Sequence, residues 1–146
     1  MKKKKLKWLL VIMWMVVIFI FSSQPGNISD ENSKFVINVF NLLGLDLNST
    51  FGDLANFIVR KGAHFTEYFI LYMLLYNALV ESFSFKKALS FSIIGVFLYA
   101  SSDEFHQSFV PGRGPAFRDV LVDTSGGAAA LITIYLYRTF KKIRRL

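Results

Sequence analysis

Residues 6–23 read LKWLLVIMWMVVIFIFSS, an apolar stretch in which only Lys7 is charged. Three further apolar stretches follow at residues 63–80, 88–107 and 120–137. Helices of about 18–23 residues are roughly 27–35 Å long, which is enough to cross a hydrocarbon layer of about 30 Å. Because a backbone in lipid must satisfy its own hydrogen bonds, helices are the expected form. We therefore predict an all-α integral membrane protein, a four-helix bundle with four spans.

The composition favours the same class of protein. Of the 146 residues, 53% are hydrophobic and 18% are charged, and the mean hydropathy is +0.43. A soluble domain of this length needs more polar surface, and a disordered chain has far fewer apolar residues. The absence of Cys excludes a disulfide scaffold, a thiolate zinc site and a cysteine nucleophile. The length suits a single membrane domain over residues 1–146.

The first apolar stretch has an alternative interpretation as a cleaved signal peptide, because four lysines precede it at residues 2–5. The stretch is long for the core of a signal peptide, however. It also ends in Phe21-Ser22-Ser23-Gln24, which is a poor match to a small-x-small cleavage site. We expect an uncleaved membrane span.

An amphipathic helix is predicted between the first two spans, over residues 30–43. Asp30 and Glu31 suit its amino-terminal end and Gly44 suits its carboxyl-terminal stop. Its apolar residues recur at spacings of three and four, at Phe35, Val36, Val39, Phe40 and Leu43. Two placements are open: on the membrane surface, or as a small lid packed on the bundle.

The distribution of positive charge predicts the orientation in the membrane. One side of the predicted membrane carries twelve basic residues: Lys2, Lys3, Lys4, Lys5, Lys7, Lys86, Lys87, Arg138, Lys141, Lys142, Arg144 and Arg145. The other side carries five: Lys34, Arg60, Lys61, Arg113 and Arg118. Because positive charge is retained inside, we expect a multi-pass protein of the cell membrane with both termini cytoplasmic. The net charge of +7 then reflects topology and contact with anionic lipid, and no nucleic-acid partner is expected.

This topology places an unusual set of polar residues at the outer ends of three spans. Arg60 and Lys61 lie just before the second span, and His64, Glu67 and Tyr68 lie in its first turns. The third span ends with Asp103, Glu104, His106 and Gln107, and the Pro-Gly turn at 110–115 that follows carries Arg113. Asp119 lies just before the fourth span, and Asp123 lies in its first turn. Their spacings of three and four give each helix one polar face. Ionisable groups at membrane depth are costly unless they pair or bind something.

Two interpretations of these polar residues are open. They form either an interhelical network, such as Arg60 or Arg113 with Glu67 or Asp119, or a site that binds a ligand at the outer face. Phosphate is the favoured ligand chemistry, since arginine forks and helix amino termini bind it well. No metal or cofactor is expected, because no H-E-x-x-H motif or diagnostic histidine spacing is present.

The binding-site interpretation can be stated in terms of particular side chains. One pocket should be lined by His64, Glu67, Asp103, His106, Gln107, Arg113 and Asp119. We expect Asp123 to point away from lipid and either to pair with a basic group or to form a hydrogen bond toward the bundle, with Arg60 and Arg113 as the nearest basic candidates. Gly126 and Gly127 predict a small-residue surface that lets the fourth helix pack closely.

Four blocks of sequence together resemble the VanZ-like family. They are FSSQPG at 21–26, RKGAHFTEY at 60–68, DEFHQSFVPGR at 103–113 and DVLVDT at 119–124. The resemblance covers nearly the whole chain in order. The chain departs from the family pattern at Asp123, where Asn is usual, and near Ala130, where a further Gly is usual. A carboxylate in place of an amide alters the charge pairing open to this site.

The resemblance implies a membrane protein associated with resistance to teicoplanin and related lipoglycopeptides, without catalytic residues that can be carried over. The first hypothesis is a cell-envelope protein that binds an anionic, lipid-linked or lipidated ligand, such as a cell-wall precursor or the lipoglycopeptide, at the outer leaflet. The second is an intramembrane enzyme acting on a lipid-linked precursor, with His64 or His106 as general base and Asp103 or Glu67 orienting it. The third is a structural or partner subunit. Transport is less favoured, because four spans lack the repeated halves of a carrier.

Overall fold

The computed structural model describes residues 2–114 and 116–144, and within these the fold is entirely helical. The elements are α1 (Lys2–Ser22), α2 (Gly26–Leu42), α3 (Leu47–Phe51), a short 3₁₀ helix η1 (Gly52–Leu54), α4 (Ala55–Leu79), α5 (Phe85–Gln107) and α6 (Phe117–Ile143). The prediction of an all-α fold is confirmed. Pro115 of the predicted turn and Arg145 of the basic tail lie outside the described residues.

Several helix boundaries differ from the predicted ones. α2 begins at Gly26, directly after Pro25, so Asp30 lies in its second turn and not at its start. Pro25 is the N-cap residue, with an extended ψ of 151°, and because it lacks a backbone N–H it separates α2 from the end of α1. The predicted stop at Gly44 is confirmed, since this residue has a φ of +86° just beyond the end of α2. α4 and α6 both extend past their apolar stretches, because polar residues at a helix end do not break hydrogen bonding.

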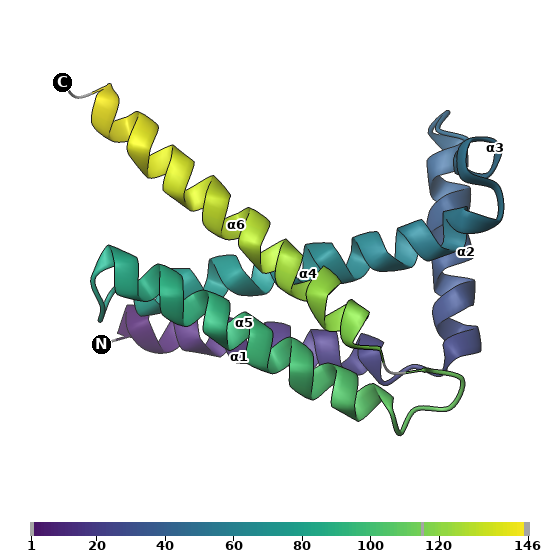
Figure 1. The fold of residues 1–146 in the computed structure, drawn as a ribbon, viewed down its shortest axis with the longest axis horizontal. Coiled ribbons are helices and arrows are strands. Elements are labelled where there is room, and N and C mark those ends of the chain that lie inside the picture. Colours follow the sequence, from purple (N-terminus) through teal and green to yellow (C-terminus); the bar gives the residue numbers. More distant parts are fainter. Residues whose placement is uncertain (1, 115, 145–146) are drawn as a thin grey trace.

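α4 lies at the centre of the fold and packs against α1, α2, α5 and α6. α6 runs diagonally across α4 and α5 (Figure 1). α2 stands nearly crosswise beyond the ends of α1, α5 and α6, where it packs against the first part of α4. The buried core between the long helices includes Ile18 of α1, Tyr68, Leu71 and Tyr72 of α4, and Val96 of α5. Because α4 contacts every other long helix, its residues are placed to link them all.

Two glycines allow α6 to lie close to its neighbours. A Cβ atom added to Gly126 would overlap the backbone carbonyl of Phe65 in α4, and one added to Gly127 would lie 2.8 Å from the Val96 side chain in α5. The predicted small-residue packing surface is therefore confirmed. This close approach brings the first turns of α6 against the first half of α4.

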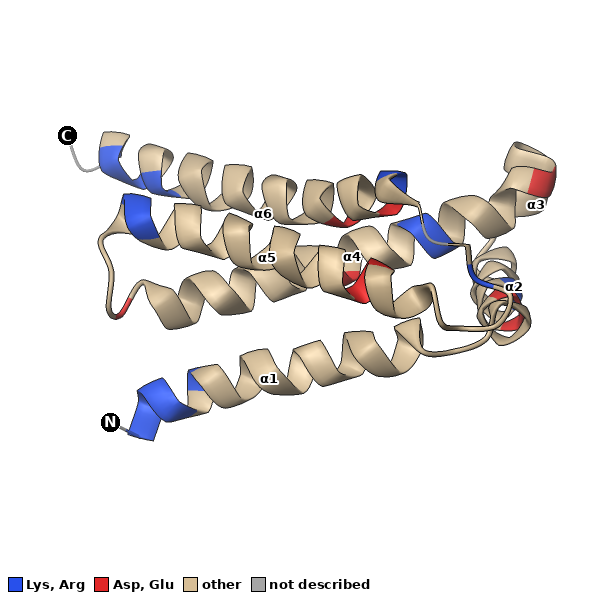
Figure 2. Ribbon diagram, turned by 60° about the horizontal axis from the view of Figure 1, so that its bottom comes forward, with Lys and Arg blue, Asp and Glu red and all other residues tan. Residues whose placement is uncertain are grey.

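Charged residues separate along the molecule (Figure 2). Lys and Arg gather where α1 and α5 begin and α6 ends, which we call the basic end. Most Asp and Glu lie at the opposite end, where α1 and α5 end and α4 and α6 begin, which we call the polar end.

Among the described residues, two helices, α1 and α6, are long and apolar enough to cross a membrane. Signal sequences and core helices of soluble proteins can share these properties. However, only 17% of the most apolar window of α1 and 28% of that of α6 is buried in the protein, which is unlike a soluble core helix. α1 is also tied into the fold, because Trp14 Nε1 donates to the Glu67 carbonyl at 2.9 Å and Tyr99 OH donates to the Met15 carbonyl at 2.6 Å.

Candidate binding site

Three helices bring His64, Asp103 and Asp123 together at the polar end. One donor atom from each of these side chains lies within 4.8 Å of those of the other two, and both carboxylates are buried. His64 Nδ1 is 3.5 Å from Asp123 Oδ1. The contact follows from helix packing, since Gly126 lies one turn after Asp123 and presses against Phe65, the neighbour of His64. We call these three residues the buried triad.

The prediction that Asp123 faces the bundle and is paired there is confirmed, since 2% of the residue is exposed and its carboxylate contacts His64. Only the candidate partners differ, because neither Arg60 nor Arg113 forms an ion pair with it. Arg60 NH1 instead lies 3.2 Å from Oδ1 of Asp30, which also accepts a hydrogen bond from Asn56 Nδ2 at 3.1 Å. Asp30 belongs to α2, so α2 takes part in the site.

A second contact joins α4 and α6 one turn nearer the polar end. Lys61 Nζ lies 2.6 Å from Asp119 Oδ2, and both side chains are partly buried. Arg118 lies beside this pair, with its guanidinium 5.8 Å from the centre of the Phe57 ring. Lys61 and Asp119 therefore neutralise each other.

The two acidic residues at the end of α5 have different roles. Asp103 Oδ2 accepts a hydrogen bond from Gln107 Nε2 at 3.1 Å, whereas its Oδ1 is buried without a partner among the described residues. Glu104 Oε1 accepts from the backbone N–H of Ala116, immediately before α6. Ala116 has no capping side chain of its own, so Glu104 satisfies one of the free N–H groups at the start of this helix.

His106 and Tyr68 lie apart from the cavity described next. His106 Nε2 is 3.1 Å from Ser23 Oγ, and its ring lies 4.6 Å from that of Phe19, so it faces α1. Tyr68 is fully buried in the core, and its hydroxyl has no hydrogen-bond partner among the described residues.

A cavity of about 220 Å³ lies between the end of α1, α2, α4 and the turn after α5. Four of the predicted site residues line it: Arg60, His64, Glu67 and Arg113. Asp103, His106, Gln107 and Asp119, which were predicted to share one pocket with them, are not among its lining residues. Sequence reasoning missed the opposite wall, formed by Phe21, Ser22, Gln24, Ser29, Asn32, Ser33 and Val36. The largely polar segment FSSQPG at 21–26 was the one feature of the sequence that could have indicated this wall.

Arg113 is fixed at the rim of this cavity by the chain that leaves α1. Its Nε donates to the Gln24 carbonyl at 3.2 Å. Close by, the Gly26 N–H donates to the Pro111 carbonyl at 3.1 Å, and Gly26 leaves no room for a Cβ beside Gly112. Burial lowers the pKa of the Arg113 guanidinium, and the charge of Arg60 lowers it further. Two like charges are therefore held near each other at one cavity.

The amino-acid sequence was compared with models of known protein families. Residues 7–140 match the VanZ/LLP1 family over nearly the whole chain. The chain belongs to the VanZ/LLP1 family. The resemblance found in the four sequence blocks is thus confirmed. No curated protein and no solved structure matches the chain. Family membership and the apolar helices α1 and α6 together make this VanZ/LLP1 chain a membrane protein.

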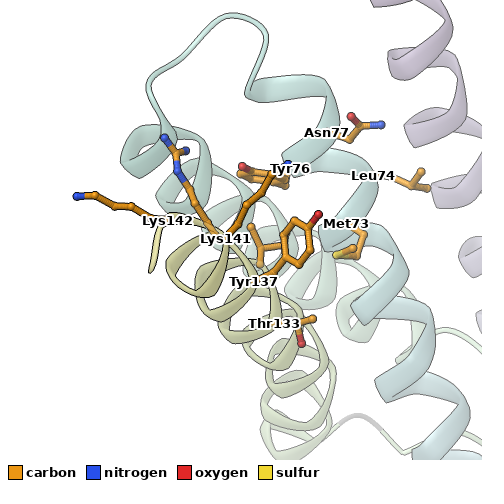
Figure 3. Close-up of a pocket in the computed structure, with 10 residues that line it drawn as sticks. Met73, Leu74, Tyr76, Asn77, Thr133, Tyr137, Lys141 and Lys142 are labelled. Atoms are coloured by element: carbon orange, nitrogen blue, oxygen red, sulfur yellow. The ribbon is translucent and has the colours of Figure 1, made fainter. Parts of the chain in front are cut away.

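This VanZ/LLP1 protein has a larger hollow at its basic end, between α4 and α6, with a volume of about 1080 Å³ (Figure 3). Apolar and aromatic side chains such as Met73 and Tyr137 line it together with the polar Asn77 and Thr133, and the Lys142 side chain of α6 extends away from the hollow. The lining residues are Met73, Leu74, Tyr76, Asn77, Thr133, Ile134, Tyr137, Arg138, Lys141 and Lys142. None of these belongs to the predicted polar site.

Proposed function

We propose that this VanZ/LLP1 protein is a multi-pass membrane protein of the cell envelope that binds the anionic group of a lipid-linked or lipidated ligand at the outer leaflet. Such binding would lower susceptibility to lipoglycopeptides of the teicoplanin type. The observation that carries the proposal is the pair Arg60 and Arg113 at one polar cavity. Planar guanidinium groups bind phosphate or carboxylate through paired hydrogen bonds, which makes them the favoured side chains for such ligands.

The proposed orientation follows from the charge distribution. With α1, α4, α5 and α6 as spans, the basic end faces the cytoplasm, where both termini then lie. The polar end, with its cavity, faces the outer leaflet. The apolar side chains of α2, including Phe35, Val36 and Phe40, are exposed in the protein. They suit a helix lying in the headgroup region of the membrane.

The size of the cavity favours a headgroup over a whole drug. Pockets that enclose drug-sized ligands have volumes of about 300–1,000 Å³, above the 220 Å³ found here. A phosphate or a similarly small anionic group fits this space. The apolar tail of the ligand would lie along the exposed faces of α1 and α2, for example against Phe19 and Val36.

The test is binding of a polyprenyl phosphate, compared with the uncharged polyprenol, to the detergent-purified protein. We expect the wild type to prefer the phosphate, and Arg113→Gln or Arg60→Gln to weaken its binding by about tenfold, because a charge-assisted hydrogen bond contributes about 1.5–3 kcal/mol. Arg118→Gln is the matched control, since Arg118 does not line the cavity. Equal binding of the two lipids, or equal loss in all three variants, would contradict the proposal.

The cellular counterpart is the teicoplanin susceptibility of cells that produce the wild type or Arg113→Gln at matched abundance. We expect the wild type alone to raise the inhibitory concentration. If Arg113→Gln protects as well as the wild type, the cavity is not the basis of resistance.

A further inference from the structure

We infer that His64, Asp103 and Asp123, the buried triad, bind a divalent metal ion of the zinc or manganese class. The three side chains come from α4, α5 and α6, and their donor atoms already lie within 4.8 Å of one another. One imidazole nitrogen and two carboxylate oxygens form a donor set that such ions accept. Because the three ligand residues come from three helices, no short sequence motif indicates the site.

An unpartnered carboxylate oxygen on one member of the triad is a second, independent observation. Asp103 is 3% exposed, and its Oδ1 has no hydrogen-bond partner among the described residues. A buried carboxylate oxygen without a partner is costly, so it calls for a cation or a donor. Gln107 holds the other oxygen of Asp103, and such a hydrogen bond from a neighbouring side chain is typical of carboxylates that bind metals.

The local charge also favours a cation. Within the described residues, Asp103 forms no ion pair, and the ion-pair partner of Asp123 is His64. The nearest lysine on α4, Lys61, is engaged by Asp119. When His64 is neutral, as a metal ligand has to be, the two buried carboxylates carry a negative charge that a divalent ion would neutralise.

The geometry needs little adjustment to bind an ion. Ligand atoms at about 2.0–2.2 Å from a zinc ion stand about 3–4 Å apart, so small side-chain rotations close the observed spacing. Calcium is less suited, because it prefers six to eight oxygen ligands. His64 also lines the polar-end cavity, so an ion can reach the triad from it. The inference concerns the metal alone and does not depend on the proposed lipid ligand.

The test is metal binding by the full chain, purified in detergent, freed of its affinity tag and stripped with a chelator. After incubation with Zn²⁺ or Mn²⁺ and desalting, we expect about one ion per chain and a rise in thermal stability with added metal. His64→Gln and Asp103→Asn should each weaken metal binding by at least tenfold. The matched controls are His106→Gln and Asp119→Asn, whose side chains lie outside the triad, and these should bind like the wild type.

The X-ray absorption spectrum of the zinc-loaded wild type gives the ligand types and their distances without depending on the folding of any variant. We expect one imidazole nitrogen and otherwise oxygen ligands at about 2.0–2.2 Å. The inference is overturned if the wild type holds no ion and gains no stability with Zn²⁺, Mn²⁺ or Mg²⁺. It is equally overturned if the bound zinc ion has two imidazole ligands. Metal binding by the triad variants that equals that of the control variants would also overturn it.

Discussion

Lys7 is the one charge inside the first apolar stretch, and its contacts explain how it is tolerated. Its Nζ lies 2.6 Å from Glu81 Oε1 and donates to the Asn77 carbonyl at 3.1 Å. The long side chain thus reaches polar groups at the basic end while its methylene groups stay among apolar neighbours. Lys7 thereby ties α1 to the turn between α4 and α5.

This pair has a pH dependence that can be measured. The hydrogen bond from Lys7 lowers the pKa of Glu81 below its ordinary value near 4.5. Because the folded-state pKa is the lower one, the pair adds stability above the ordinary pKa and loses it as the pH falls through the lowered value. We expect Lys7→Gln to return the midpoint of Glu81 toward 4.5 in a carboxyl-carbon NMR titration. Lys34→Gln, on α2, is the control, and an unchanged midpoint in Lys7→Gln would refute the assignment.

At the same scale, the sequence predicted that Asp123 points inward but not which residue it meets. The predicted depth of Asp123 in the membrane and the cost of a charge in lipid were sufficient for the first statement. The second required the position of α2, because Asp30 engages Arg60 and so removes it as a partner for Asp123. Long-range pairing of this kind has no periodic signal in the chain.

At the scale of the helices, the contact between α4 and α6 depends on Gly126. Its Cα faces the backbone of Phe65, which cannot move aside as a flexible side chain could. We expect Gly126→Ala to destabilise the fold by about 1–3 kcal/mol, the usual cost of overpacking. Thermal unfolding in detergent, followed by circular dichroism, measures the change.

Gly62→Ala is the matched control for this prediction. Gly62 is also inside a helix, but a Cβ at this position meets nothing within 4 Å. Alanine there should be neutral or stabilise by about 0.5–1 kcal/mol, through helix propensity. Equal unfolding temperatures for the two variants would show that the close approach at Gly126 does not support the fold.

Apolar stretches predicted the existence of all four long helices, because burial of apolar side chains and helix formation coincide within them. They did not predict the ends. α4 starts at Ala55, ahead of residue 63, and α2 starts at Gly26, ahead of Asp30. Helix ends are set by hydrogen bonding and by residues such as Pro25, and neither follows the hydropathy.

At the scale of the whole molecule, the separation of charge links the fold to the membrane. The predicted partition of Lys and Arg reappears as the basic end of the structure, although its members are far apart in the sequence (Figure 2). The triad and the cavity both lie at the opposite, polar end, because α4 and α6 begin where α1 and α5 end. The directions of the helices in the sequence were enough to predict that these polar residues lie at one end. Which of them form the triad and which line the cavity depends on how α6 crosses α4, and this could not be predicted.

The orientation itself is the last prediction. The chain has no natural Cys, so a single introduced thiol reports one position without background. Asn48 lies in α3 beyond the polar end and Lys142 lies near the end of α6, and both are exposed. In intact cells, an impermeant maleimide should label Asn48→Cys, and it should label Lys142→Cys only after the membrane is opened. Labelling of Lys142→Cys but not of Asn48→Cys in intact cells would place the Arg60–Arg113 cavity on the cytoplasmic side, where a ligand of the outer leaflet could not reach it.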